Sequence, residues 1–370
     1  MSIVSTYYFT MPIHPNEPFN DLPLLPPKED VETKKILNAS ISANKKLAEL
    51  KGFADTIPNQ GIFINTLSLK EAQYSSEIEN IITTTDELYQ ALSSPDKNID
   101  ASTKEVLRYK NALWKGVSLL QTRPFLTTNV IVDIQAELIQ NNAGIRSLPG
   151  TALKHAITGD IVYTPPVGNQ RIKEKLKNLE DYLHSEDGID PLIKLAVMHY
   201  QFEAIHPFYD GNGRTGRILN VLYLVQQNLL QQPILYLSHH IIKNKNDYYA
   251  LLRHVTFQNN YEPWILFMLT CIDKSAEETI QTIKAIQNLM KTFSEKIKQQ
   301  FPNMYSRDLI DVLFQQPYCK VKLLETANIA KRQTGSDYLH RLERAGFLKS
   351  KKVGRENLSL NTALLELFKK

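Results

Sequence analysis

The sequence predicts a mainly α-helical protein with a small β-hairpin flap and a C-terminal winged helix-turn-helix domain. Apolar residues recur at helical spacing through most of the chain from about Val31 onward. A stretch between residues 144 and 170 that is rich in Gly and Pro interrupts this pattern. After residue 305, three short helical patterns are followed by a basic, β-like ribbon, which is the order of a winged helix.

The composition is that of an ordinary globular protein. The chain has 370 residues, of which 42% are hydrophobic and 22% charged, enough for two or three domains. A formal net charge of +4 is too small by itself to indicate nucleic-acid binding. Cys271 and Cys319 have no metal or redox spacing, so we expect reduced thiols in a cytoplasmic protein. No signal peptide is expected, and no window predicts a membrane span.

The region before the hairpin is predicted to be an arm followed by helices. Six prolines between residues 12 and 27 predict an extended arm. Ser68 and Glu71 form a capping-box pattern that predicts a helix opening at LKEAQYSSEIEN, and Thr84 and Glu87 form a second one. Periodicity predicts two further helices, over 104–120 and 129–140.

The middle of the chain changes character and then returns to helices. The segment GIRSLPGTALKHAITGDIVYTPPVGNQ predicts a short β-hairpin or flap that ends at VYTPP. Helices are then expected over 172–184, 191–204, 215–227, 247–255 and 263–268, with a long helix over 274–300 that stops before Pro302.

These patterns predict three regions. Residues 1–110 are predicted to form an N-terminal helical region with the proline-rich arm, 111–300 a central core, and 305–370 the winged-helix domain. Lysines and arginines outnumber acids in the last region, where Gly354 is expected to turn the ribbon. DNA or a protein is therefore the partner expected for this tail.

The segment HPFYDGNGRTGR, residues 206–217, concentrates unusual chemistry. Its glycines satisfy G-x-G-x-x-G, but the preceding PLIKLAVMHYQFEAI is helical, and a dinucleotide-binding fold would need a strand there. A loop between two helices fits better, because Pro207 ends the first helix and the second begins near Arg214.

A loop of this kind is suited to bind a polyphosphate. The N–H groups in the first turn of the second helix are unpaired, and glycines allow close approach of an anion. Arg214 and Arg217 lie three residues apart on that helix and can both reach one polyphosphate. Asp210 suits a Mg²⁺ that bridges phosphates. His206 suits a base that takes a proton near neutral pH.

These twelve residues resemble the signature of the Fic family, His-Pro-Phe-x-(Asp/Glu)-Gly-Asn-Gly-Arg-x-x-Arg, at every defining position. The similarity extends from the N-terminal arm to about residue 300 and includes VYTPP and NDYYALL. It implies a Fic-type helical bundle that transfers AMP from ATP to a Ser, Thr or Tyr hydroxyl of a protein.

The resemblance also implies roles for individual residues. His206 would be the general base, and Asp210 would hold Mg²⁺ on the phosphates. Phe208 would pack the loop inward. The residues implied to bind the phosphates of ATP are Gly211, Asn212, Gly213, Arg214 and Arg217.

Two further pairs are candidates outside the signature. Tyr248 and Tyr249 are expected to contact adenine or ribose, with the alternative that at least one of them is a core residue. Thr164 and Pro165 are expected on a flap that docks the backbone of the target as an added strand.

A second short pattern, SSEIEN, begins at Ser75. Ser75 and Glu79 are four residues apart and share a helix face, which taken alone is typical of a solvated acidic surface. In a chain that resembles the Fic family, it is similar to the inhibitory motif (Ser/Thr)-x-x-x-Glu-(Gly/Asn). The resemblance implies that Glu79 pairs with Arg217 and keeps it from the γ-phosphate of ATP.

The leading hypothesis is therefore an autoinhibited protein AMP-transferase that uses ATP and Mg²⁺ and modifies itself and other proteins. Two alternatives stay open. The same site could remove AMP or transfer another nucleotide phosphate, or the chain could be a nucleotide-sensing DNA-binding regulator. A homo-oligomer is compatible with each hypothesis.

Overall fold

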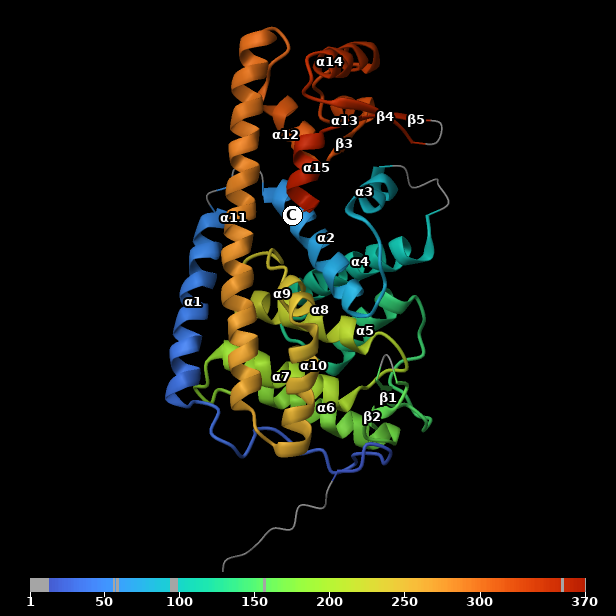
Figure 1. The fold of residues 1–370 in the computed structure, drawn as a ribbon, viewed down its shortest axis with the longest axis vertical. Coiled ribbons are helices and arrows are strands. Elements are labelled where there is room, and N and C mark those ends of the chain that lie inside the picture. Colours follow the sequence, from blue (N-terminus) through green and yellow to red (C-terminus); the bar gives the residue numbers. More distant parts are fainter. Residues whose placement is uncertain are drawn as a thin grey trace, which may run out of the picture.

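The computed structural model describes residues 13–55, 57, 60–93, 99–155, 158–353 and 356–369. Pro12 of the arm and Gly354 and Arg355 of the ribbon turn lie outside these residues. The chain is mainly helical, as predicted, with two small antiparallel sheets (Figure 1). Within the described part, no helix is long and apolar enough to cross a membrane.

The helices before the hairpin are α1 (Lys34–Asp55), α2 (Gln60–Ile78), α3 (Thr85–Ser93), α4 (Ala101–Thr122) and α5 (Thr128–Ile139). The predicted hairpin is present as strands β1 (Leu153–Lys154) and β2 (Ile161–Tyr163), which pair antiparallel. The helices that follow are α6 (Asn169–Leu183), α7 (Pro191–Ile205), α8 (Asn212–Gln226), α9 (Ser238–Lys243), α10 (Lys245–Gln258) and α11 (Glu262–Gln300).

One of the two capping predictions is confirmed and the other is wrong. Thr84 and Glu87 bond reciprocally at the start of α3, with N···O distances of 2.8 and 3.2 Å. Ser68 instead lies buried in the middle of α2, where its hydroxyl donates to the Asn65 carbonyl. The helix begins earlier because Ile62 and Phe63 bury an apolar face upstream of Ser68.

The predicted boundary between residues 110 and 111 falls inside α4, which continues without a break to Thr122. This helix packs against α5 and α8. At Gly116 the contact is so close that a Cβ would overlap Leu222 of α8 and approach Ile134 of α5 to 3.2 Å. The helix therefore belongs to both the N-terminal region and the core.

Helix α11 is longer than predicted. The expected helices 263–268 and 274–300 form one helix of 39 residues, about 58 Å at 1.5 Å per residue. It stays continuous because buried Met268, Cys271 and Ile272 join the two apolar stripes. It ends before Pro302, as predicted, and α1 packs along it (Figure 1).

The N-terminal arm is held by side chains of the core. Lys175 donates to the Leu22 carbonyl at 2.6 Å, and Asn178 bonds both the N–H and the carbonyl of Leu25. Near the hairpin, the N–H of Phe19 donates to the Thr164 carbonyl at 2.9 Å. These hydrogen bonds join the irregular segment to α6 and to the segment after the hairpin.

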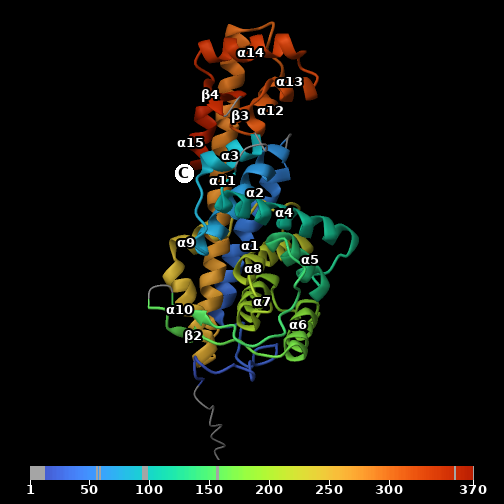
Figure 2. The same ribbon diagram turned by 90° about the vertical axis from the view of Figure 1, so that its right-hand side faces the viewer.

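The C-terminal elements gather at one end of α11 (Figures 1 and 2). They are α12 (Arg307–Gln315), β3 (Tyr318–Cys319), α13 (Val321–Thr326), α14 (Arg332–Arg344), β4 (Lys349–Val353), β5 (Glu356–Leu360) and α15 (Thr362–Lys369). The three strands form an antiparallel sheet in the order β3-β5-β4. The helices precede the two-stranded ribbon as expected, while the assignment as a winged helix and the DNA partner stay predictions.

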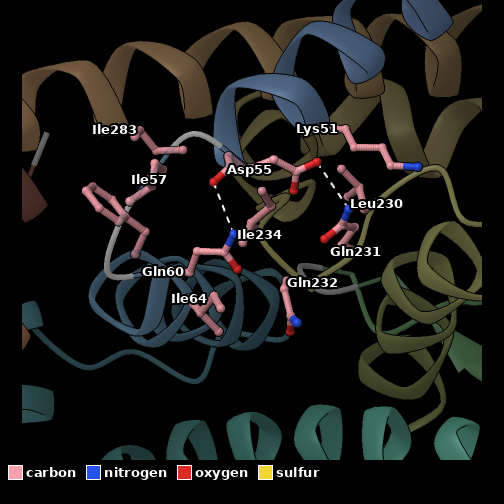
Figure 3. Close-up of a pocket in the computed structure, with 12 residues that line it drawn as sticks. Lys51, Asp55, Ile57, Gln60, Ile64, Leu230, Gln231, Gln232, Ile234 and Ile283 are labelled. Carbon is pink, nitrogen blue, oxygen red and sulfur yellow. Dashed lines mark hydrogen bonds between the residues drawn. The ribbon is translucent and has the colours of Figure 1, made fainter.

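A small pocket lies where α1, α2 and the segment after α8 meet (Figure 3). At its rim Gln231 donates to the Asp55 carboxylate at 3.1 Å, and Gln60 donates to the Ala54 carbonyl at 3.3 Å. None of the site residues predicted from the sequence lines this pocket.

Candidate active site

The segment HPFYDGNGRTGR is a loop between two helices, as predicted. Helix α7 ends at Ile205, and His206 follows in the left-handed region with φ 49°. A residue other than glycine stays in this conformation only where its surroundings hold it. Helix α8 begins at Asn212, two residues earlier than expected, so both arginines lie within its first two turns.

The loop is closed by its own side chains. Asn212 Oδ1 accepts the N–H of Phe208 at 2.8 Å, and its amide nitrogen donates to the Phe208 carbonyl at 2.9 Å. Gly211 has φ 79°, and a Cβ there would lie 2.7 Å from Ile139. Only glycine combines this conformation with such close packing. The backbone of residues 211–213 is therefore fixed at the helix N-terminus.

Arg146 holds the loop from behind and was not identified from the sequence. Its side chain is fully buried and donates to the carbonyls of His206 at 2.7 Å, Ile205 at 3.2 Å and Pro166 at 2.6 Å. One guanidinium thus connects the end of α7 with the segment after β2. A lone Arg in GIRSLPG carries no local signal for this role.

The surroundings of His206 keep its imidazole neutral. Burial lowers the pKa of His206 to about 4, and the nearby charge of Arg146 acts in the same direction. The Nδ1 atom is buried and has no hydrogen-bond partner among the described residues. At neutral pH the imidazole is therefore unprotonated and has a lone pair available for a proton from a bound hydroxyl.

The predicted contact between Glu79 and Arg217 is present. Arg217 Nη2 donates to Glu79 Oε1 at 2.7 Å and to the Ser75 carbonyl at 2.9 Å, and its Nε donates to the Ser75 hydroxyl at 2.8 Å. Only 1% of the Arg217 side chain is exposed, against 34% for Glu79. The Nε and Nη2 donors of this guanidinium are thus directed at the end of α2.

The end of α2 explains how Glu79 is aimed. Asn80 adopts the left-handed region with φ 61°, and its N–H donates to the Glu77 carbonyl. The N–H of Ile81 donates to the Ser76 carbonyl, which completes a Schellman motif. Glu79 is therefore the cap residue after the last helical turn, and the asparagine that follows it supplies the conformation that ends the helix.

The Glu79 carboxylate also covers the helix N-terminus of the loop. A Cβ on Gly213 would overlap Glu79 Oε1 and lie 3.1 Å from Arg217 Nη1. Burial opposes ionisation, but the charge and the hydrogen bond of Arg217, together with the charge of Arg214, outweigh it and lower the pKa of Glu79. The carboxylate thus lies charged where an anion would approach Gly213.

Arg214 and Asp210 face a different set of groups. Arg214 Nη1 donates to Glu105 of α4 at 2.7 Å, and its Nη2 lies 3.7 Å from Asp210 Oδ1. The Asp210 side chain is 70% exposed, and the same oxygen accepts the N–H of Gly211 at 2.6 Å. An exposed carboxylate beside a helix N-terminus is compatible with Mg²⁺, which takes one or two carboxylates together with phosphates of a substrate.

The two tyrosines have separate positions. Tyr248 is buried, and its hydroxyl lies 2.8 Å from His199 Nε2 in an aromatic group with Trp264. Tyr249 is exposed, and its hydroxyl lies within the electrostatic reach of Glu79 and Arg217. The core alternative therefore describes the packing of Tyr248, whereas Tyr249 is partly exposed.

Thr164 and Pro165 are buried next to the N-terminal arm. The Thr164 hydroxyl donates to the Pro15 carbonyl at 2.6 Å, and its carbonyl accepts the N–H of Phe19. These groups are thus already bonded to the arm, and their part in docking a target stays a prediction.

Three family models match the chain in succession. The Fic/DOC family N-terminal model matches residues 37–118, and the Fic/DOC family model matches residues 125–224. The C-terminal domain model of the SoFic-like protein adenylyltransferases matches residues 289–364 and so begins inside α11. Together with the signature loop, these matches show that the chain belongs to the Fic family.

Relatives with curated names support the same assignment. The protein adenylyltransferase fic-1 of Caenorhabditis elegans is 33% identical over 134 residues, which cover 36% of this chain and 24% of the relative. A probable protein adenylyltransferase of Aquifex aeolicus is 27% identical over 194 residues, covering 52% of this chain and 56% of the relative. The chain thus spans between a quarter and just over half the length of these relatives.

Solved structures share the fold. A Fic family protein from Desulfovibrio desulfuricans superposes with a TM-score of 0.59 at 18% identity, over 91% of this chain and 98% of that chain. Fic-1 of C. elegans, residues 134–508, superposes with a TM-score of 0.52 at 21% identity, over 67% of this chain and 74% of that chain.

Proposed function

We propose that this chain is a protein adenylyltransferase that transfers AMP from ATP to Ser, Thr or Tyr hydroxyls of target proteins and of itself, and that Glu79 inhibits it. The relatives' names support AMP transfer in general. The observation that carries the proposal is a neutral His206 at one end of a loop whose other end is a helix N-terminus with two arginines.

In the proposed reaction, the target hydroxyl loses its proton to the His206 imidazole while its oxygen attacks the α-phosphorus of ATP. A new P–O bond forms, the bond to the β-phosphate oxygen breaks, and pyrophosphate leaves. The N–H groups of Gly211, Asn212 and Gly213 and the side chain of Arg214 would bind the phosphates. Asp210 would hold Mg²⁺, which neutralises charge on the phosphate oxygens when bound.

The proposed inhibition follows from the position of Glu79. Its carboxylate bonds Arg217, which the γ-phosphate needs, and lies against Gly213, where it repels an incoming phosphate. A misplaced α-phosphorus costs on the order of 10²-fold in rate. Glu79→Gly removes the carboxylate and keeps Arg217, so it should release the enzyme. Arg217→Ala should not, because it also removes the ligand of the γ-phosphate.

The test is transfer of label to protein with Mg²⁺ and ATP labelled at either the α- or the γ-phosphate. Glu79→Gly should incorporate α-label on the order of 10²-fold faster than wild type and no γ-label. Glu79→Gly with His206→Ala should incorporate neither. The proposal fails if the double variant still transfers AMP, if the label comes from the γ-phosphate, or if Glu79→Gly is no faster than wild type.

The opposite reaction can be tested with the same reagents. A carboxylate beside His206 is also placed to position a water molecule on an AMP-modified hydroxyl, since the charge of Glu79 acts on the His206 imidazole. The modified product of Glu79→Gly should be incubated with the wild-type chain. Release of AMP by wild type but not by Glu79→Gly would favour removal of AMP as the activity of the resting enzyme.

A further inference from the structure

Both arginines of the loop are bonded by carboxylates from the N-terminal helices, but in two different ways. Glu79 follows α2 and bonds Arg217, whereas Glu105 belongs to α4 and bonds Arg214 at 2.7 Å. We infer that Glu105 is a positioning residue that orients the Arg214 guanidinium toward the phosphates of a nucleotide at the loop. This inference rests on the proposed function of that loop.

Arg214 needs a counter-charge where it lies. It is in the first turn of α8, at the positive end of the helix dipole, and only 4% of its side chain is exposed. Arg217, a second buried cation, follows one turn later. A guanidinium with so little water around it is unfavourable unless a carboxylate is bonded to it. The half-buried Glu105 provides that carboxylate.

The contact with Glu105 uses one edge of the guanidinium and leaves the other toward the loop. Nη1 donates to Glu105, whereas Nη2 lies on the side of Asp210, 3.7 Å from its carboxylate. Nε is buried and has no partner among the described residues. An arginine presents its N–H groups in a fixed planar fork, so fixing Nη1 also fixes the direction of Nη2.

The carboxylates of Glu79 and Glu105 lie at different positions relative to the loop. Glu79 lies over Gly213, where a bound anion would be. It accepts a hydrogen bond from Arg217 Nη2, which also donates to the Ser75 carbonyl. Glu105 approaches from α4, which packs on α8 and crosses it closely at Gly116 and Leu222. Removing Glu79 should therefore free the site, and removing Glu105 should let Arg214 turn away from it. The two changes have opposite expected signs.

The experiment measures binding of ATP with Mg²⁺ by calorimetry in a parent that cannot turn over, Glu79→Gly with His206→Ala. Glu105→Ala in this parent should raise the Kd about 10- to 100-fold, comparable to the loss of affinity when a group that orients a metal ligand is removed. Glu105→Gln keeps an oxygen acceptor and should recover part of the affinity. The matched control is Asp133→Ala, which removes an exposed ion pair with Arg123 and should leave the Kd unchanged.

Equal or tighter ATP binding by Glu105→Ala would overturn the inference, because Glu105 would then be a second inhibitory carboxylate or a purely structural one. If Glu105→Ala does not fold, Glu105→Gln decides in the same way: its Kd must exceed that of the parent at an unchanged unfolding temperature. If the parent binds ATP but the Glu79→Gly variant transfers no AMP, the result contradicts only the proposed function. A parent that does not bind ATP overturns both.

Discussion

Arg217 Nη2 donates a hydrogen bond to Glu79 Oε1 at 2.7 Å, and the two residues are 138 positions apart in the sequence. The arginine is buried and the carboxylate is at the edge of the loop, so the pair joins α8 to the end of α2. The charge of Glu79 raises the pKa of Arg217 although burial opposes it.

Ser75→Ala should raise AMP transfer by about 10-fold, less than Glu79→Gly. The substitution removes the hydroxyl that accepts from Arg217 Nε but keeps Glu79. A hydrogen bond to a charged group contributes about 1.5 kcal/mol or more, which corresponds to about a factor of 10. Incorporation of α-labelled AMP measures the effect.

The neighbouring serine is the control for this prediction. Ser76 is also buried, but its hydroxyl has no hydrogen-bond partner among the described residues. Ser76→Ala should therefore transfer AMP at the wild-type rate. If the two variants transfer equally fast, the Ser75 hydroxyl has no part in holding Arg217.

Gly213→Ala should destabilise the wild-type chain but not the Glu79→Gly variant. A Cβ on Gly213 would overlap the Glu79 carboxylate, whereas without that side chain its nearest neighbour is Arg217 Nη1 at 3.1 Å. Gly213 is helical, where alanine is intrinsically favoured by about 1 kcal/mol. A double-mutant cycle from denaturant unfolding should give a coupling of roughly 0.5–3 kcal/mol. Additive effects would mean that Glu79 does not lie over Gly213 in solution.

Glu203→Gln should stabilise the protein more at pH 8 than at pH 5. Burial raises the pKa of Glu203 to about 7, and its Oε1 is buried without a hydrogen-bond partner among the described residues. The pKa of an unfolded glutamate is about 4.3. Between that pH and about 7, Glu203 therefore keeps a proton in the folded state that it has lost in the unfolded state. The free energy of unfolding of the wild-type chain therefore falls as pH rises from about 4 to about 7.

The readout for Glu203 is the change in Tm caused by Glu203→Gln at each pH. Glu186→Gln, at an exposed glutamate before α7, is the control and should show no such difference. A gain in Tm that is the same at pH 5 and pH 8 would contradict a protonated Glu203 in the folded state.

Asp86→Ala should loosen the C-terminal elements from the rest of the protein. Asp86 of α3 accepts hydrogen bonds from Tyr318 at 2.5 Å and from Lys351 at 2.7 Å. Hydrogen bonds to charged groups contribute about 1.5–3 kcal/mol each, so the tail should become sensitive to protease before the core does. Lys320→Ala, which removes the partly exposed pair with Glu356, should change stability by less than about 1 kcal/mol. Equal protection of both variants would show that Asp86 does not hold the tail.

The tail also shares a core with α11, which the sequence did not reveal. Phe293 near the end of α11 packs against Phe314 and Phe347, with ring centroids 5.2 and 5.4 Å apart. Helical periodicity predicted that the core ends at Gln300. It identifies the apolar face of a helix but does not show which element packs against that face. The C-terminal unit therefore includes the last turns of α11, in agreement with the family model that begins at residue 289.

The sequence by itself determined the features that depend on neighbours in the chain. The loop from His206 to Arg217 follows from a helix stop at Pro207, three glycines and a helix start, all within twelve residues. The four-residue spacing of Ser75 and Glu79 placed both on the side that meets Arg217, although that meeting itself was suggested by the family motif. The hairpin and the arm followed from Gly and Pro, whose backbone preferences are local.

Only the tertiary structure decided which charged groups meet across the bundle. Glu105 and Arg146 are unremarkable in sequence, because an ion pair or a carbonyl contact between segments far apart in the chain leaves no periodic pattern. The burial of Glu203 Oε1 likewise leaves no local signal. Ser68 matched a capping box yet lies inside a helix, because burial of Ile62 and Phe63 outweighs a local start signal. Local signals placed the loop, and long-range packing determined which side chains surround it.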